Sequence, residues 1–136
     1  MFRILLAEDN PGDVMLFQEA LRERNLRFDL AVARDGQQAN AMVQDLIAGG
    51  LRPHLIVLDV NLPRLNGDEV LRQIRLEPAL AGTPVVVLTS SSSPLDKAAA
   101  DSLGASLYLQ KASDLDGLYR VGRIIEDILR QPNGVA

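Results

Sequence analysis

Short, uninterrupted apolar runs alternate along this chain with longer segments of helical periodicity. Residues 4–7, 55–58 and 85–88 are continuously apolar, and residues 107–109 form a shorter run. Continuous runs of about 4–8 residues are typical of strands buried on both faces, as in a parallel sheet. Residues 28–33 alternate instead, which predicts a less covered strand at an edge of the sheet.

The segments between the runs carry apolar residues at spacings of three and four, the period of an amphipathic helix. Two of these segments open with a polar residue followed by proline, Asn10-Pro11 and Ser93-Pro94. This pair is typical of an N-cap with proline in the first helical position. The predicted helices are residues 11–24, 36–48, 67–76, 94–103 and 114–130.

Five successive strand–helix units predict an α/β fold, with right-handed crossovers and a doubly wound parallel sheet. Five units are too few for an eight-unit barrel, so the sheet is open. If the alternating second strand and the short fifth strand are the edges, the strand order is 2-1-3-4-5, the flavodoxin-like order. The units fill about residues 2–130, so we expect one domain over 1–136, with no output domain appended.

Charge and composition narrow the functional classes. The formal net charge is −4 and the arginines are scattered, which argues against a DNA-binding protein. The chain contains no cysteine, which excludes disulfides and thiolate zinc sites. The apolar stretch at the N-terminus is too short for a signal peptide or a membrane span, so we expect a cytoplasmic protein.

Polar residues gather where the predicted strands end. In doubly wound sheets the functional site lies outside the carboxyl ends of the strands, near the point between strands 1 and 3 where the order reverses. The residues at these ends are Glu8, Asp9, Asp59, Thr89 and Lys111. Carboxylates without nearby His or Cys favour Mg²⁺, and a carboxylate can itself be the nucleophile toward a phosphoryl group. A lysine and a hydroxyl would share the charge of that group, so the set predicts phosphoryl transfer.

Several other chemistries fit less well. The chain has neither a P-loop pattern nor a G-x-S-x-G elbow. His54 precedes the third strand at the opposite end of the sheet, so we expect a structural or surface role for it. A phosphatase of the haloacid dehalogenase class usually has a second Asp two residues after its nucleophile, where this chain has Asn61. A flavin phosphate would be repelled by the acids after the first strand.

Taken together, these residues resemble a response-regulator receiver domain of two-component signalling. The resemblance spans about residues 2–130 and rests on Glu8-Asp9, Leu55-Ile56-Val57-Leu58-Asp59, Pro63, Gly67, Thr89-Ser90 and Lys111. It implies that Asp59 accepts a phosphoryl group from the phosphohistidine of a sensor histidine kinase. It also implies that Asp9 binds Mg²⁺ directly, Glu8 through water, and Asn61 through its backbone carbonyl, together with Asp59.

The resemblance also assigns the phosphoryl contacts and the output. Thr89 and Lys111 match the hydroxyl and the lysine that meet the phosphoryl group. Tyr108 matches the aromatic switch that turns inward as Thr89 moves. The altered surface would be the helix at 94–103, the strand at 107–109 and the helix at 114–130, read by an unidentified downstream protein.

One departure from the family pattern follows the lysine. The family usually has a cis proline there, whereas this chain has Ala112. A cis bond before a residue other than proline costs about 2.5–4 kcal/mol, so the Lys111–Ala112 bond is either trans or strained. This departure and the segment 8–13 are similar to small regulators that partner bacterial and cyanobacterial phytochromes.

Two alternatives stay open at this point. On the last helix, beside an inner stripe that begins at Leu115, the residues Val121, Ile124 and Ile128 form a second apolar stripe. That stripe predicts either a homodimer or partner surface, or a broad face covered by neighbouring elements. The function could also be that of a degenerate receiver, which binds partners without phosphorylation.

Overall fold

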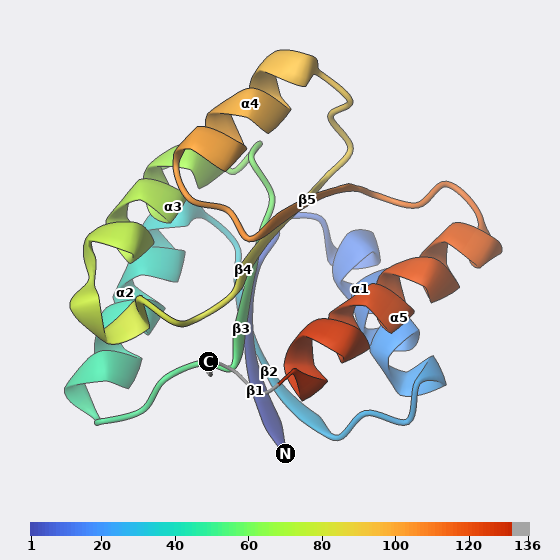
Figure 1. Cartoon of the computed structure of the whole chain (residues 1–136), viewed down its shortest axis with the longest axis horizontal. Coiled ribbons are helices and arrows are strands. Elements are labelled where there is room, and N and C mark those ends of the chain that lie inside the picture. Colours follow the sequence, from blue (N-terminus) through green and yellow to red (C-terminus); the bar gives the residue numbers. More distant parts are fainter. Residues whose placement is uncertain (132–136) are drawn as a thin grey trace.

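The computed structural model describes residues 1–131 of the chain. Five parallel strands form a sheet in the order β2-β1-β3-β4-β5, and helices cover both of its faces (Figure 1). The strands are β1 (Phe2–Ala7), β2 (Phe28–Ala33), β3 (Leu55–Leu58), β4 (Val85–Thr89) and β5 (Leu107–Gln110). The helices are α1 (Pro11–Glu23), α2 (Gly36–Ala48), α3 (Gly67–Leu76), the short 3₁₀ helix η1 (Pro78–Leu80), α4 (Pro94–Ser102) and α5 (Leu115–Arg130). The predicted fold and strand order are confirmed.

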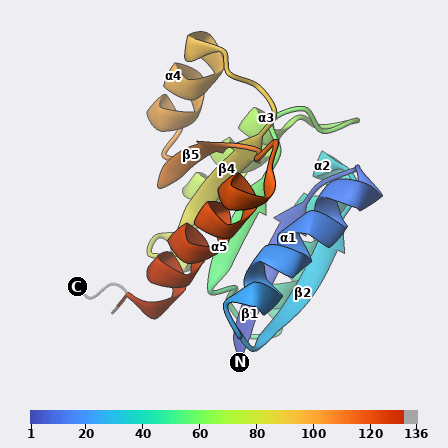
Figure 2. The ribbon, with the colours of Figure 1, turned by 90° about the vertical axis from the view of Figure 1, so that its right-hand side faces the viewer.

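The sheet separates two apolar cores. Helices α1 and α5 lie side by side on one face, and α2, α3 and α4 lie toward the other (Figures 1 and 2). Successive strand residues point to opposite faces, so Leu5 and Ile56 enter one core while Ile4 and Leu55 enter the other. The continuous apolar runs are therefore explained by burial on both faces.

Strand β2 is an edge strand, as its alternating pattern predicted. Phe28, Leu30 and Val32 are half-buried, whereas Asp29 and Ala31 are exposed. The inward-facing residues Phe28 and Leu30 pack against the core beneath α1 and α5. One covered face is therefore enough to fix the register of this strand.

Helix starts follow the capping signals. The side chain of Asn10 accepts a hydrogen bond from the Asp13 N–H at 3.1 Å, and that of Ser93 accepts one from the Asp96 N–H at 3.4 Å. Helices α1 and α4 each end one residue before the predicted boundary, within the fraying expected of helix ends. Helix η1 was not predicted. The guanidinium of Arg75 donates to the carbonyl of Leu80, the last residue of η1, and to the carbonyl of Thr83 just beyond it.

The orientation of α5 differs from the prediction and corrects it. Leu115, placed on the inner stripe, is 59% exposed, whereas Val121, placed on the interface stripe, is 8% exposed and packs in the core. The cause lies at Gly122, where a Cβ atom would come within 2.5 Å of the Ala20 carbonyl oxygen. This close approach to α1 turns Val121 inward, so Val121 is unavailable to a partner.

The other two residues of that stripe, Ile124 and Ile128, are half-buried. Ile128 packs against the core beneath α1 and α5. Among residues 1–131, no helix is long and apolar enough to cross a membrane.

Candidate functional site

The carboxyl ends of β1 and β3 bring three acidic side chains together. Glu8 and Asp59 are 4% and 5% exposed, and Asp9 is exposed. One carboxylate oxygen from each of the three lies within 4.8 Å of the others. Strands β1 and β3 are neighbours in the sheet, which is why residues about fifty positions apart meet here. This all-oxygen donor set fits a hard divalent cation such as Mg²⁺.

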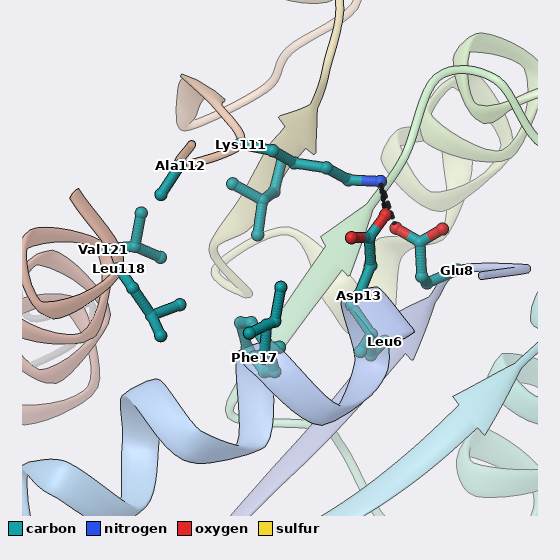
Figure 3. A pocket seen from close by; sticks show the side chains of 10 residues that line it. Leu6, Glu8, Asp13, Phe17, Lys111, Ala112, Leu118 and Val121 are labelled. Atoms are coloured by element: carbon teal, nitrogen blue, oxygen red, sulfur yellow. Dashed lines mark hydrogen bonds and ion pairs between the residues drawn. The ribbon is translucent and has the colours of Figure 1, made fainter. Parts of the chain in front are cut away.

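Lys111 completes the cluster from the end of β5. Its Nζ lies 2.9 Å from Asp59 Oδ2, 2.6 Å from Glu8 Oε1 and 2.7 Å from Asp13 Oδ2. Figure 3 shows the lysine reaching toward Asp13 and Glu8. Burial alone would lower the pKa of Lys111, but the three carboxylates outweigh burial and raise the pKa above its usual 10.5. The ammonium is therefore charged across the physiological range.

The two buried carboxylates differ in acidity. Burial raises the pKa of Asp59, but the Asn61 N–H, which donates to Oδ1 at 3.0 Å, and the Lys111 ammonium bring the pKa below 3.8. Burial raises the pKa of Glu8 above 4.5 despite its contacts with Lys111 and the Asn10 N–H. Asp59 is thus an anion at neutral pH, the form in which a carboxylate acts as a nucleophile.

The loop between β4 and α4 joins Thr89 to Tyr108. Thr89 is fully buried, and its hydroxyl accepts a hydrogen bond from the Ser91 N–H at 3.3 Å. The half-buried Tyr108 donates its hydroxyl to the Ser91 carbonyl at 3.3 Å. Ser91 in turn donates its hydroxyl to Asp96 at 2.5 Å. Ser91 thus connects Thr89 by hydrogen bonds to Tyr108 and to the first turn of α4.

The backbone around the site has two notable positions, Gly67 and Ala112. A Cβ atom on Gly67 would lie 2.2 Å from the Asp59 carbonyl oxygen, so only glycine lets α3 begin this close to β3. The peptide bonds of residues 1–131 are all trans, and the Lys111–Ala112 bond is among them. The question raised by the missing proline is therefore settled in favour of trans.

His54 lies away from the site, as expected. It sits at the amino end of β3, where its Nδ1 accepts a hydrogen bond from the Arg3 N–H at 2.8 Å. Its ring meets Phe2 edge to face, with the ring centroids 5.7 Å apart. These contacts fit a structural role at the surface.

Asp13 is a site residue that the sequence reasoning did not assign. It pairs with Lys111 although 98 positions separate them. The sequence did contain a signal for this role. Asp13 lies three residues after the Asn10 cap, in the first turn of a helix that begins beside the carboxyl end of β1. The position of α1 relative to β5 was needed to turn that signal into a contact.

Comparison with known proteins shows which family the chain belongs to. The model of the response regulator receiver domain matches residues 4–121, which includes every residue of the acidic cluster and Lys111. The chain belongs to this family. As a receiver domain it is a phosphoacceptor rather than a classical enzyme, which sets aside the phosphatase and flavin-binding alternatives.

Cyanobacterial relatives cover nearly the whole receiver domain. Response regulator Rcp1 of Synechocystis sp. is 40% identical over 125 residues, 90% of this chain and 85% of Rcp1. The structure of Mn²⁺-bound Rcp1 superposes with a TM-score of 0.84, at 38% identity and 96% coverage of both chains. The phosphorylated cyanobacterial phytochrome response regulator RcpA gives a TM-score of 0.85 at 36% identity, with 96% of this chain and 94% of RcpA covered. The predicted similarity to phytochrome response regulators is confirmed in sequence and in fold.

Proposed function

We propose that the chain is a phosphorylation-dependent response regulator in which Asp59 is the phosphoacceptor. An Asp59 carboxylate oxygen would form a bond to phosphorus while the phosphorus–nitrogen bond of a phosphohistidine breaks and the imidazole keeps the electron pair. The observation that carries this proposal is the Lys111 ammonium 2.9 Å from Asp59 Oδ2. A buried, ionised carboxylate beside a fixed cation is prepared to accept an anionic group.

The donor set supports Mg²⁺ as the cofactor. Asp9, Asp59 and the backbone carbonyl of Asn61 would hold the ion directly, and Glu8 would hold it through water. The ion would offset charge on the phosphoryl group as the new bond forms. Lys111 and the Thr89 hydroxyl would contact the phosphoryl oxygens, with Lys111 supplying positive charge.

The proposed output runs through the Ser91 loop to the α4–β5–α5 face. If the Thr89 hydroxyl turns toward the phosphoryl group, it gives up its bond from the Ser91 N–H, and Tyr108 is free to turn inward. The phosphoryl group would thereby shift the population of the domain from one conformation toward another. Leu95 on α4 is 81% exposed and, with the half-buried Ile124 and Ile128, offers apolar area to a downstream protein or to a second copy of the chain.

The relatives suggest the kinase. RcpA is described as a cyanobacterial phytochrome response regulator, and a bacteriophytochrome regulator, AtBRR, is 32% identical with a TM-score of 0.74. We therefore propose a sensor histidine kinase of the phytochrome type as the phosphodonor. The competing function is that of a degenerate receiver, which the intact set of acids, hydroxyl and lysine disfavours.

Metal removal tests the proposed function. Incubation with acetyl phosphate and Mg²⁺ is expected to add one phosphoryl group to the intact mass, because the carboxylates then have a cation to offset the incoming charge. Excess EDTA should abolish the addition, and excess Mg²⁺ added afterwards should restore it. No added mass with Mg²⁺ present would favour the degenerate receiver, and equal labelling in EDTA would contradict the role of the metal.

A further inference from the structure

Asp13 contacts the site from α1, and the proposed reaction gives it no task. Its N–H donates to the capping side chain of Asn10, which fixes the first turn of the helix. Its Oδ2 lies 2.7 Å from Lys111 Nζ, and Glu8 Oε1 lies 2.6 Å from the same atom. Its side chain is 32% exposed, against 7% for Asp59. Asp13 is thus an outer partner of the lysine on a fixed backbone.

The three carboxylate partners of Lys111 are not equivalent. An ammonium has three N–H donors, and three carboxylates lie within reach of them. Glu8 and Asp59 also belong to the acidic triad with Asp9, whereas Asp13 does not. Under the proposed function, Glu8 also holds Mg²⁺ through water, and Asp59 also binds Mg²⁺ and the phosphoryl group. The contact with Asp13 is the one that no step of the reaction needs to break.

The side chain of Lys111 is 17% exposed, and it borders a small cavity. A small pocket of about 40 Å³ lies beside it between α1 and α5. Phe17, Ala112, Leu118 and Val121 line this pocket, and Figure 3 shows the lysine extending toward the acids, away from Ala112, Leu118 and Val121. A lysine stem is flexible, and ordering it costs conformational entropy. Burial confines the stem of the lysine, and the ion pairs at its tip hold the ammonium in place.

We propose that Asp13 is a positioning residue that holds the Lys111 ammonium against the phosphoacceptor. It supports phosphoryl transfer to Asp59 through the lysine, without touching the phosphoryl group. This inference rests on the proposed function, because it presumes that Lys111 meets the phosphoryl group. It predicts that the rate of phosphorylation depends more on a hydrogen-bond acceptor at position 13 than on a negative charge there.

Three variants separate these contributions in an acetyl phosphate assay at saturating Mg²⁺. Asp13→Ala removes the contact and is expected to slow phosphorylation roughly tenfold, the lower end of the effect of losing a supporting partner at a metal site. Asp13→Asn keeps an acceptor oxygen and should lose clearly less. Glu23→Ala removes one negative charge from the exposed last turn of the same helix and should leave the rate unchanged. Both Asp13 variants lose the same helix-terminal charge, so the loss of that charge affects them equally.

The sequence offers a direct readout of the lysine itself. The chain contains two lysines, Lys97 and Lys111. Lys97 pairs with Asp101 on the surface of α4, with its side chain 58% exposed, and serves as an internal reference. In ¹⁵N spectra of the ammonium groups, without phosphodonor, Asp13→Ala is expected to shift or broaden the Lys111 signal. The Lys97 signal should stay in place.

Each outcome decides the proposal. Slower phosphorylation together with a changed Lys111 signal, and partial rescue by Asp13→Asn, supports it. An unchanged or faster rate in Asp13→Ala overturns it, because Asp13 would then be neutral or would compete for the lysine. A slower rate with an unchanged Lys111 signal also overturns it. If the unaltered protein takes up no phosphoryl group, the proposed function fails, and the spectra alone still decide whether Asp13 holds Lys111.

Discussion

Replacing Asp59 with asparagine is expected to abolish phosphorylation by acetyl phosphate. The uncharged amide oxygen of asparagine is a poor nucleophile, so the rate should fall by at least about a thousandfold, as when the nucleophile of an enzyme is removed. The fold should survive, because the amide still accepts from the Asn61 N–H and Lys111 keeps Glu8 and Asp13 as partners. Intact mass over a time course measures the loss.

Asp45→Asn is the matched control for this variant. Asp45 is an exposed aspartate near the end of α2 and lines a pocket with Arg3 at the amino end of β1, so the same chemical change there should leave the labelling rate untouched. Thermal unfolding followed by circular dichroism checks that both variants are folded. Labelling of Asp59→Asn at the rate of the unaltered protein would place the phosphoacceptor elsewhere.

Leu71→Ala is expected to produce a large loss of stability. Leu71 is fully buried in the core that α2 and α3 form with the sheet. Removing a buried leucine side chain costs about 2–5 kcal/mol, the sum of lost burial and the cavity left behind. Urea unfolding should show this as a lower midpoint with an unchanged slope.

The same helix supplies the control. Leu76 stands five residues later and is 74% exposed, so Leu76→Ala should change the free energy of unfolding by less than about 0.5 kcal/mol. The two variants share the residue type, the helix and the chemical change. Equal losses for Leu71→Ala and Leu76→Ala would contradict the packing of α3 on the sheet.

Much of the fold was predictable because local and global signals agree. The runs at 4–7, 55–58 and 85–88 are buried on both faces, and the alternating run at 28–33 lies at an edge. The capping residues Asn10 and Ser93 correctly located the starts of α1 and α4. The carboxyl ends of the strands then identified where acids, hydroxyl and lysine would meet, since parallel strands end at one edge of the sheet.

The remaining features depend on how helices pack, which spacing alone does not determine. Helix α5 turns Val121 inward because Gly122 lets it approach Ala20 on α1, a contact between elements a hundred residues apart. Asp13 meets Lys111 for a similar reason, since the long lysine side chain after β5 reaches the first turn of α1. The Ser91 link between Thr89 and Tyr108 depends on the path of a loop whose serines look alike in the sequence.

The central claim is that Asp59 is the residue that carries the phosphoryl group, and chemical trapping tests it most directly. Borohydride reduces an aspartyl phosphate to homoserine, which tandem mass spectrometry can locate. Trypsin cuts after Arg34 and Arg64 but poorly before Pro53, so Asp59 falls in one peptide with Asp35 and Asp45, and fragment ions distinguish the three. After acetyl phosphate and Mg²⁺, homoserine is expected at position 59 and should be absent when EDTA replaces Mg²⁺. Homoserine at another aspartate, or at none, would contradict the assignment.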